Sequence, residues 1–432
     1  MDIVVEGRQT LSGEVIPSGS KNSAVAIIPA TVLFDKPVKL RNIPDITDVT
    51  RLVEILESFG SHITWNKNTC ELDIDNSDLA FDKLDSESLG KMRGSSLLWG
   101  PMLGRFGKVN FGQLPGGCTL GFRTLTPHYK AFADLGVTVR SQLNGVVMDA
   151  SRAASGNVWL SEMSPTATEN CVALAVKLPG YTRIIGAASE PQVQDLCKFL
   201  ISAGAKIKGV GSNVLEVEGV KHLNPVKHAI YSDHYEITTF LAMGAVTGGE
   251  IRVRNAMPEL FGYINQVFAK FGVVISYEKD TAVVAKGQKI RFDYEEGRNL
   301  MAVKAQPWPG LPVDVLPLFI PMALAAPGGS VLFHNWMYEA GLFWTSELTK
   351  LGANIVMCDP HRVIVLADGQ RLKGAKMEAP YIIRATVALL LAAMISSGQS
   401  QITNGDALYR GHPHFAENLK KLGASVSELN SK

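Results

Sequence analysis

Apolar positions along the chain follow a helical spacing that gives way to strict alternation, and the change falls each time at a glycine. Apolar side chains before the glycine recur as on one face of a helix, and those after it alternate with polar ones as in a half-buried strand. Glycine suits the left-handed conformation that ends many helices. The pattern occurs six times at intervals of about 70 residues, around Gly60, Gly136, Gly204, Gly272, Gly352 and Gly423.

Strand-like runs such as GEIRVRNA and HRVIVLA, and apolar helices such as ATVALLLAAMISS, lie between these copies. Each unit is therefore a mixed α/β module. Units of this length favour globular lobes, since solenoid repeats usually have only about 20 to 50 residues. We expect two lobes of three units each, with a small-molecule site in a cleft.

The composition narrows the class of protein. A chain of 432 residues is too long for one ordinary core, and 46% hydrophobic residues with a formal net charge of +1 argue against a nucleic-acid or membrane-surface protein. Five scattered cysteines without ligand spacing favour neither a disulfide framework nor a metal site. Without a signal peptide or a membrane-spanning apolar run, a cytoplasmic protein is expected.

The segment GQLPGGCTLGFR at residues 112–123 holds the most distinctive chemistry. Its glycines and proline predict a sharply turned loop around Cys118. Arg123 follows five residues later, and a thiol near a guanidinium ionises more readily, so Cys118 can act as a nucleophile or a proton donor. From the loop alone, an ordinary glycine-rich surface turn is an equally good interpretation.

Other charged residues suggest an anion site. Lys21 and Asn22 in SGSKN can hold an anionic oxygen, although a solvated turn explains them equally well. Arg93, Arg123 and Arg410 could together bind a small, highly charged anion, whereas each alone is explained as a surface charge.

Two carboxylate positions have different expected roles. Asp314 lies in the apolar, proline-rich run PWPGLPVDVLPLF, where a buried carboxylate needs a structural or a functional partner. Asp233 and Glu236 resemble a helix N-cap followed by an acidic residue at the third helical position, which is a structural role.

Six units in two lobes, SGSKN near the start, LPGGC followed by an arginine, and LPVD together resemble the enolpyruvyl transferases over the whole chain, and most closely the branch that acts on UDP-N-acetylglucosamine. The resemblance implies an α/β fold of two inside-out α/β barrels, built from six βαβαββ-like units. Residues 1–20 and 232–432 would form lobe I, and residues 21–231 would form lobe II with the cysteine loop. The implied reaction moves the enolpyruvyl (1-carboxyvinyl) group of phosphoenolpyruvate to a substrate hydroxyl and releases phosphate, by addition to a tetrahedral intermediate and then elimination.

The resemblance also implies residue roles. Cys118 would protonate the methylene carbon of phosphoenolpyruvate, and Asp314 would take the proton of the acceptor hydroxyl. Phosphoenolpyruvate would be bound by Lys21, Asn22, Arg123 and Arg410, of which Lys21, Arg123 and Arg410 would stabilise developing charge. The acceptor would be bound by Asn22, Arg93, Arg123, Thr124, Leu125, Thr126, Pro127, Ser164, Pro165, Thr166, Asp314 and Met337. No metal or organic cofactor is implied.

The chain departs from the family's pattern at the acceptor end. SPTATEN has Pro165 and Thr166 where valine and glycine are usual near a diphosphate, and RTLTPH has Thr126 where an aspartate is usual. The family usually has an arginine where this chain has Gly341, and an acidic residue where this chain has Ile382. The residues expected to bind phosphoenolpyruvate therefore match the family, whereas several of the residues expected near the acceptor differ from it.

Three hypotheses follow. The first is a carboxyvinyltransferase acting on a uridine nucleotide, with UDP-N-acetylglucosamine as the expected acceptor, in peptidoglycan synthesis for the cell wall. The second keeps this chemistry but uses the ribose hydroxyl of UMP or a related nucleotide, as in nucleoside-antibiotic biosynthesis. The third is a non-catalytic paralogue. The expected partners are small molecules, not nucleic acid or membrane, and the oligomeric state is left open.

Overall fold

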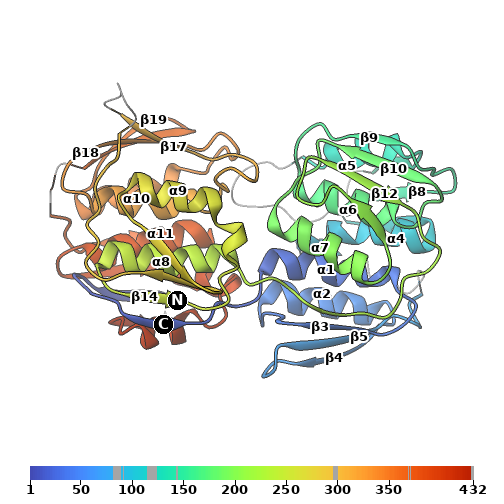
Figure 1. The fold of residues 1–432 in the computed structure, drawn as a ribbon, viewed down its shortest axis with the longest axis horizontal. Coiled ribbons are helices and arrows are strands. Elements are labelled where there is room, and N and C mark those ends of the chain that lie inside the picture. The colour runs from blue at the N-terminus through green and yellow to red at the C-terminus, as the bar shows by residue number, and fades with distance from the viewer. Residues whose placement is uncertain are drawn as a thin grey trace. The chain divides into compact units, whose positions relative to one another are not determined.

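The computed structural model describes residues 1–80, 89–90, 92–113, 124–142, 145–294, 300–367, 369 and 371–429, without the side chain of Arg410. The chain forms two compact units (Figure 1). Unit 1 comprises Met1–Ser18 and Ser232–Lys432, and unit 2 comprises Gly19–Cys118 and Phe122–Tyr231. The chain thus leaves unit 1 after Ser18 and returns to it after Tyr231.

Strands in the described part of unit 2 form three sheets. Their orders are β13 (Lys227–Ala229), β3 (Val38–Arg41), β5 (Glu71–Asp75), β4 (His62–Asn66); β6 (Lys108–Phe111), β8 (Val146–Asp149), β7 (Thr138–Ser141); and β11 (Lys206–Lys208), β12 (Val214–Glu218), β10 (Tyr181–Ile185), β9 (Asn157–Trp159).

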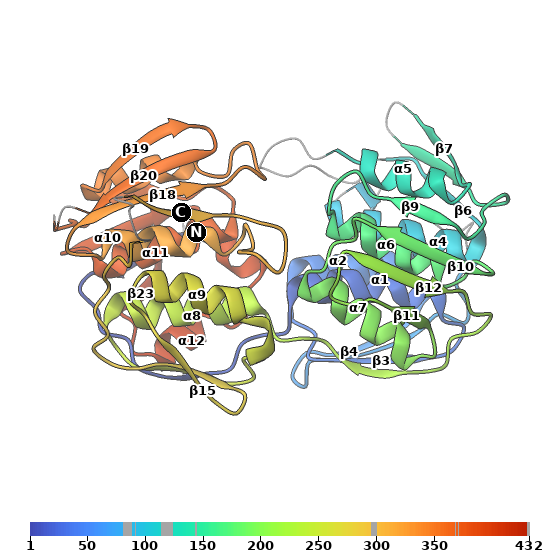
Figure 2. The same cartoon turned by 45° about the horizontal axis from the view of Figure 1, so that its top comes forward.

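The helices of unit 2 differ in burial. Three are largely buried, and Figure 2 shows them among the other elements of the unit: α1 (Lys21–Ala30), α4 (Trp99–Phe106) and α6 (Pro165–Ala175). The amphipathic helices around them are α2 (Thr47–Ser58), α5 (Thr126–Asp134) and α7 (Pro191–Ser202), with short 3-10 turns at η1 (Thr31–Leu33) and η3 (Arg93–Leu98). Because α4 packs on α6, and α6 on α5 and α7, the apolar core is continuous.

Unit 1 has three sheets in its described residues. Their orders are β21 (Lys376–Glu378), β22 (Gln399–Thr403), β1 (Asp2–Glu6), β23 (Val426–Leu429); β15 (Ile275–Glu278), β16 (Thr281–Val284), β14 (Ile251–Val253), β2 (Gly13–Val15); and β17 (Met301–Lys304), β18 (Gly329–His334), β20 (Arg362–Ala367), β19 (Asn354–Asp359).

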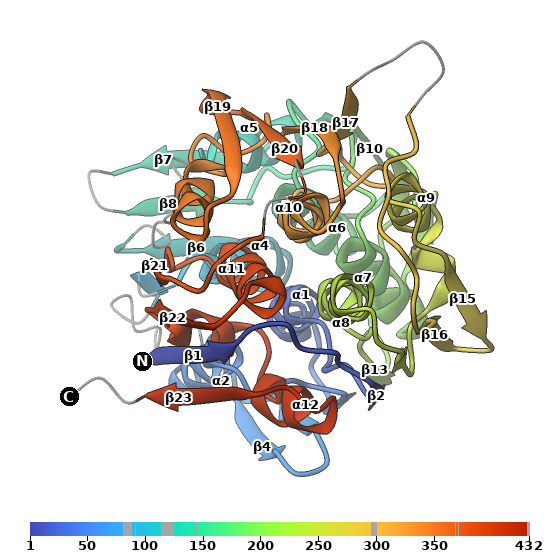
Figure 3. The same cartoon turned by 90° about the vertical axis from the view of Figure 1, so that its left-hand side faces the viewer.

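Three buried helices also form the centre of unit 1, and Figure 3 looks along them with strands on several sides: α8 (His234–Thr247), α10 (Leu316–Leu324) and α11 (Ile383–Ile395). Apolar residues surround their axes, as expected for helices buried on all sides. The other helical segments are η4 (Pro258–Leu260), α9 (Gly262–Lys270), η5 (Phe343–Leu351), η6 (Gly405–Arg410) and α12 (Phe415–Lys421).

The four-stranded sheets share one pairing scheme, with a parallel pair at one edge and antiparallel pairs across the rest. The strand at the other edge is the one that follows a glycine of the sequence pattern. A mixed α/β fold is therefore confirmed, while the inside-out barrel arrangement remains a prediction.

The six glycines of the pattern all have positive φ, from +69° at Gly272 to +103° at Gly60. Each stands between a helical segment and an edge strand, where glycine enters this conformation without a steric penalty. One copy differs in detail, because η5 before Gly352 is a 3-10 helix.

Candidate functional site

Several predicted site residues cannot be placed. Cys118 and Arg123 lie outside the described residues, and so does the side chain of Arg410, which ends η6. Asn22, Lys21, Arg93, Thr124–Pro127 and Ser164–Thr166 lie in unit 2, and Asp314 and Met337 lie in unit 1. The predicted acceptor residues of unit 2 that the structure describes stand at or beside the starts of helical segments.

Lys21 is the first residue of α1, and Ser20 caps this helix by accepting the Ser23 N–H at 3.2 Å. The Lys21 ammonium lies 2.6 Å from a carboxylate oxygen of Asp48 in the first turn of α2, and both side chains are less than one-fifth exposed. Sequence reasoning missed Asp48 because an acidic residue in a first helical turn is common on its own account. This ion pair holds the Lys21 ammonium beside the first turn of α2.

Arg93 and the start of α5 form the first part of a polar network. The Arg93 guanidinium donates to the Thr124 carbonyl at 3.4 Å. The Thr124 hydroxyl accepts the Thr126 N–H at 3.1 Å and lies 2.7 Å from the Thr126 hydroxyl. Leu125 and Pro127 complete this helix start, where they supply backbone and no side-chain cap.

The start of α6 forms the second part. Ser164 caps α6 by accepting the Ala167 N–H at 3.3 Å, and Pro165 takes the first helical position. The Thr166 hydroxyl lies 3.0 Å from Nε2 of His128 on α5. Asn170 donates to Nδ1 of the same ring at 3.1 Å, so the His128 proton is on Nε2 and is donated to Thr166.

His128 joins the two parts of the network. Its ring is 3% exposed, and burial together with the nearby charge of Arg93 lowers its pKa to about 3. The imidazole is therefore a neutral donor with a fixed tautomer near neutral pH. No motif in the sequence singled out His128, although RTLTPH contains it.

The network brings together predicted residues that are far apart in the chain. Arg93, Thr124, Thr126, Ser164 and Thr166 supply one guanidinium and four hydroxyls, which can bind a polar ligand that carries hydroxyls and negative charge.

In unit 1, Asp314 lies in a turn directly before α10 and is half-buried, less buried than its apolar surroundings suggested. Met337 is half-buried in the segment after β18. A half-buried carboxylate keeps access to a ligand, which a proton acceptor needs.

The predicted N-cap of α8 is confirmed, with one difference. Asp233 accepts the N–H groups of Tyr235 and Glu236 at 2.9 and 3.0 Å. Glu236 does not reach back to Asp233, however, because its carboxylate accepts the Ser18 N–H at 2.7 Å, and the Asp233 N–H donates to the Ser18 carbonyl at 2.8 Å. The helix start thus anchors the last residue of the N-terminal segment of unit 1.

The two lost family positions have local explanations. A Cβ at Gly341 would lie 2.1 Å from Nδ2 of Asn335, so the space for a side chain is already filled. Ile382 precedes α11, where an acidic residue was expected, and Arg384 two residues later is held instead by Asp233 and His412.

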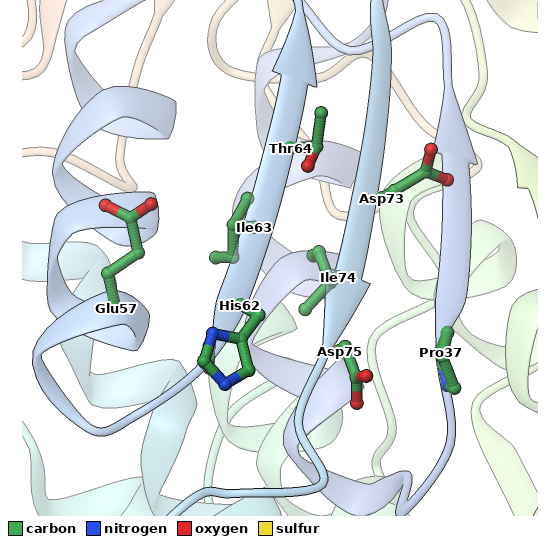
Figure 4. Close-up of a pocket in the computed structure, with 9 residues that line it drawn as sticks. Pro37, Glu57, His62, Ile63, Thr64, Asp73, Ile74 and Asp75 are labelled. Atoms are coloured by element: carbon green, nitrogen blue, oxygen red, sulfur yellow. The ribbon is translucent and has the colours of Figure 1, made fainter.

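A pocket of about 500 Å³ lies elsewhere in unit 2 (Figure 4). It is lined from α2, β4 and β5 and contains the carboxylates Glu57, Asp73 and Asp75 beside His62. Three carboxylates repel an anionic ligand, and none of the predicted site residues lines this pocket.

No three His, Cys, Asp or Glu side chains in the described ranges gather in a way that could hold a metal ion. Within the same ranges, no helix has the length and apolar character needed to cross a bilayer.

Comparison with known proteins defines the class. A profile of the EPSP synthase (3-phosphoshikimate 1-carboxyvinyltransferase) family matches residues 5–419. The chain belongs to this family and is an enolpyruvyl transferase, as its motifs predicted.

Two relatives and one solved structure show which members of the family this chain resembles. The UDP-N-acetylglucosamine 1-carboxyvinyltransferase of Borreliella burgdorferi is 36% identical over 99% of each chain. The protein of the same name from Bradyrhizobium diazoefficiens is 38% identical over 99% of this chain and 97% of its own. Among solved structures, the enolpyruvyl transferase NikO from Streptomyces tendae has a TM-score of 0.86 at 22% identity, covering 100% of this chain and 99% of its own, and the likeness shows the shared fold.

Proposed function

We propose that the protein transfers the enolpyruvyl group of phosphoenolpyruvate to a hydroxyl of a uridine nucleotide and releases phosphate. The observation that carries the proposal is 36–38% identity over nearly the whole chain to enzymes named UDP-N-acetylglucosamine 1-carboxyvinyltransferase. UDP-N-acetylglucosamine is therefore the default acceptor.

The proposed reaction balances with side chains alone. The acceptor oxygen attacks C2 of phosphoenolpyruvate while Asp314 takes its proton and Cys118 gives a proton to the methylene carbon C3. The tetrahedral intermediate then returns a C3 proton to the Cys118 thiolate and expels phosphate, which takes the proton held by Asp314. The double bond is thereby restored in the enol ether product.

Cationic side chains would stabilise the negative charges of phosphoenolpyruvate and of the transition state. Lys21, Arg123 and Arg410 are proposed to hold the phosphate and carboxylate of phosphoenolpyruvate, with Asn22 beside them. The 2.6 Å pair between Lys21 and Asp48 supports this, because it holds the ammonium in one place before substrate arrives.

The polar network of unit 2 is proposed to bind the acceptor, through Arg93, the Thr124–Pro127 turn and the Ser164–Thr166 turn. Its hydroxyls suit a ribose or a sugar, and its guanidinium suits a phosphate.

A second acceptor, the ribose hydroxyl of UMP, keeps the same chemistry. The specific observation in its favour is the replacement of acceptor-end residues, since Pro165 and Thr166 alter the start of α6 and Gly341 has no space for a side chain. A site whose polar partners change discriminates strongly between acceptors.

The test is phosphate release from phosphoenolpyruvate with UDP-N-acetylglucosamine and UMP as parallel acceptors, with product mass measured for each. Turnover with either supports enolpyruvyl transfer and names the acceptor. Absence of phosphate release with both, in protein that is folded by circular dichroism, would contradict the proposal and favour a non-catalytic paralogue.

A further inference from the structure

The imidazole of His234 takes no part in the proposed reaction, although it lies at the first position of α8 and is 1% exposed. Within the residues that the structure describes, its Nε2 has no hydrogen-bond partner. A buried polar atom without a partner costs stability, so its presence needs an explanation. The contacts of the ring give one.

His234 lies against the loop that carries Asp314. The ring centroids of His234 and Trp308 are 6.0 Å apart with an angle of 73° between the planes, which is an edge-to-face contact. Trp308 belongs to the segment between β17 and α10 that also contains Asp314, and all of these residues lie in unit 1. The contact therefore joins the start of α8 to the loop of the proposed proton acceptor.

Two turns close this loop. The Gln306 N–H donates to the Leu311 carbonyl at 2.9 Å, and the Val315 N–H donates to the Pro312 carbonyl at 3.0 Å. Leu311 and Val315 are fully buried, which fixes both turns in the core. A displacement at the start of the loop therefore reaches its end, where Asp314 lies.

The start of α8 holds the His234 ring from its other side. Asp233 caps the helix by accepting the Tyr235 N–H at 2.9 Å, and the ring centroids of His234 and Tyr235 lie 3.9 Å apart. The Arg384 guanidinium lies over the Tyr235 ring, 4.6 Å from its centroid. The His234 ring is thus fixed where it meets the loop.

The His234 ring meets the loop as a neutral group. Burial lowers its pKa to about 4, against the opposing effect of the Asp233 charge. Near neutral pH the imidazole is therefore uncharged, and it contacts Trp308 through its shape and not through its charge. A phenyl ring at the same position can reproduce this contact.

We propose that His234 is a positioning residue for Asp314. Its ring holds Trp308, and through the two closed turns it holds the Asp314 carboxylate where the acceptor hydroxyl loses its proton. The proposal deepens the proposed function and rests on it for the role of Asp314.

The experiment measures kcat and the KM for phosphoenolpyruvate by phosphate release, on the full chain, with UDP-N-acetylglucosamine and with UMP. His234→Ala should lower kcat about 10- to 100-fold, because a misplacement of about 1 Å can cost about 10²-fold, while the KM changes less than about twofold. His234→Phe keeps the edge-to-face contact and should keep kcat within about threefold of the wild type. Trp308→Ala should reproduce the loss seen in His234→Ala.

A second background separates positioning from a general loss of stability. In Asp314→Asn the group that His234 positions is already absent, so adding His234→Ala should lower the residual rate by less than about twofold. A merely structural role would lower the rate by the same factor in both backgrounds. Phe261→Leu, a cavity variant of the fully buried residue before α9, controls for stability and should leave kcat unchanged.

A wild-type kcat in folded His234→Ala overturns the positioning role, and so does a His234→Phe variant that is no more active than His234→Ala. An equal loss in the Asp314→Asn background overturns it too. If His234→Ala does not fold, a wild-type kcat in Trp308→Ala overturns the role, and a selective loss of kcat there with activity kept in His234→Phe supports it.

The failure of the proposed function gives a different result. Absence of phosphate release by the folded wild type with both nucleotides refutes the transfer and the positioning role together. Turnover by the wild type with an unaffected His234→Ala variant overturns the positioning role alone.

Discussion

The guanidinium of Arg384 donates to Nε2 of His412 at a distance of 2.7 Å. Because a guanidinium can only donate, the imidazole accepts at Nε2 and carries its proton on Nδ1, which lies 3.8 Å from the Glu236 carboxylate. His412 and Glu236 are fully buried, and Arg384 is 11% exposed. The His412 ring therefore lies between Arg384 in the first turn of α11 and Glu236 in the first turn of α8.

Replacing His412 by alanine should lower the free energy of unfolding by about 2–3 kcal/mol, because a buried guanidinium loses its acceptor. The stacking of the ring on Phe415 would be lost as well. Urea denaturation measures the change. His414→Ala is the matched control two residues away, since His414 is 51% exposed and should cost less than about 0.5 kcal/mol. Equal effects of the two variants would show that the link to Arg384 does not stabilise the fold.

His128 predicts a loss of stability in acid. Its pKa in the folded protein is about 3, below the ordinary value of 6.5, chiefly because of burial. Between these two pH values His128 binds a proton in the unfolded chain but not in the native protein. The contribution of His128 to the free energy of unfolding is therefore fully present above pH 6.5 and is lost as the pH drops toward 3. His128→Asn should flatten the pH dependence of the free energy of unfolding, measured by urea denaturation, between pH 6.5 and 4 by up to about 1.4 kcal/mol per pH unit. An unchanged slope would contradict this prediction.

Glu169 on α6 should make the protein less stable as the pH rises. Burial, with a smaller contribution from Glu190, raises its pKa to about 8 from 4.5. The native carboxyl therefore holds a proton that the unfolded chain has lost, and stability falls as the pH rises from 4.5 through 8. Glu169→Gln keeps the shape of the protonated side chain and should gain stability over the wild type between pH 7 and pH 9. The exposed Glu162→Gln controls for charge removal, and a Glu169→Gln variant that follows the wild type across this range would refute the assignment.

Local signals made much of the fold predictable. A helical period ending at glycine, followed by alternation, depends on neighbouring residues only, and all six glycines have the positive φ that the pattern required. The 3-10 geometry of η5 was not visible, because apolar spacing over so few residues fits either helix.

The site was predictable only in part, since its bonds join distant parts of the chain. Thr166 and His128 are 38 residues apart, and Arg384 and His412 are 28 apart, so no short motif contains either pair. The resemblance named Thr166 and Arg93 as residues of the acceptor site, but their connection through His128 depends on how α5 packs against α6.

Gly341 should tolerate no side chain. A Cβ there would lie 2.1 Å from Nδ2 of Asn335, which is buried and accepts the Tyr338 N–H through its other amide atom. Gly341→Ala should therefore lower the free energy of unfolding by about 1–3 kcal/mol through overpacking. Gly156→Ala is the control, because no atom within 4 Å would meet its Cβ. In a double-mutant cycle, Asn335→Ala should reduce the cost of Gly341→Ala, and strict additivity would contradict a direct clash.

Cys118 should be replaceable by another acid but not by an inert side chain. Addition to phosphoenolpyruvate needs a proton on the methylene carbon, and a general acid in such a step contributes about 10²- to 10⁴-fold in rate. Cys118→Ala should lose most phosphate release by such a factor, whereas Cys118→Asp should retain part of it, with its optimum moved to lower pH because an ordinary aspartic acid has a pKa of about 4. Cys70→Ala, which removes a half-buried thiol on the turn before β5, controls for the loss of a cysteine. Steady-state phosphate release between pH 5 and 8 measures all three, and equal rates in Cys118→Ala and Cys118→Asp would mean that the thiol is not the proton donor.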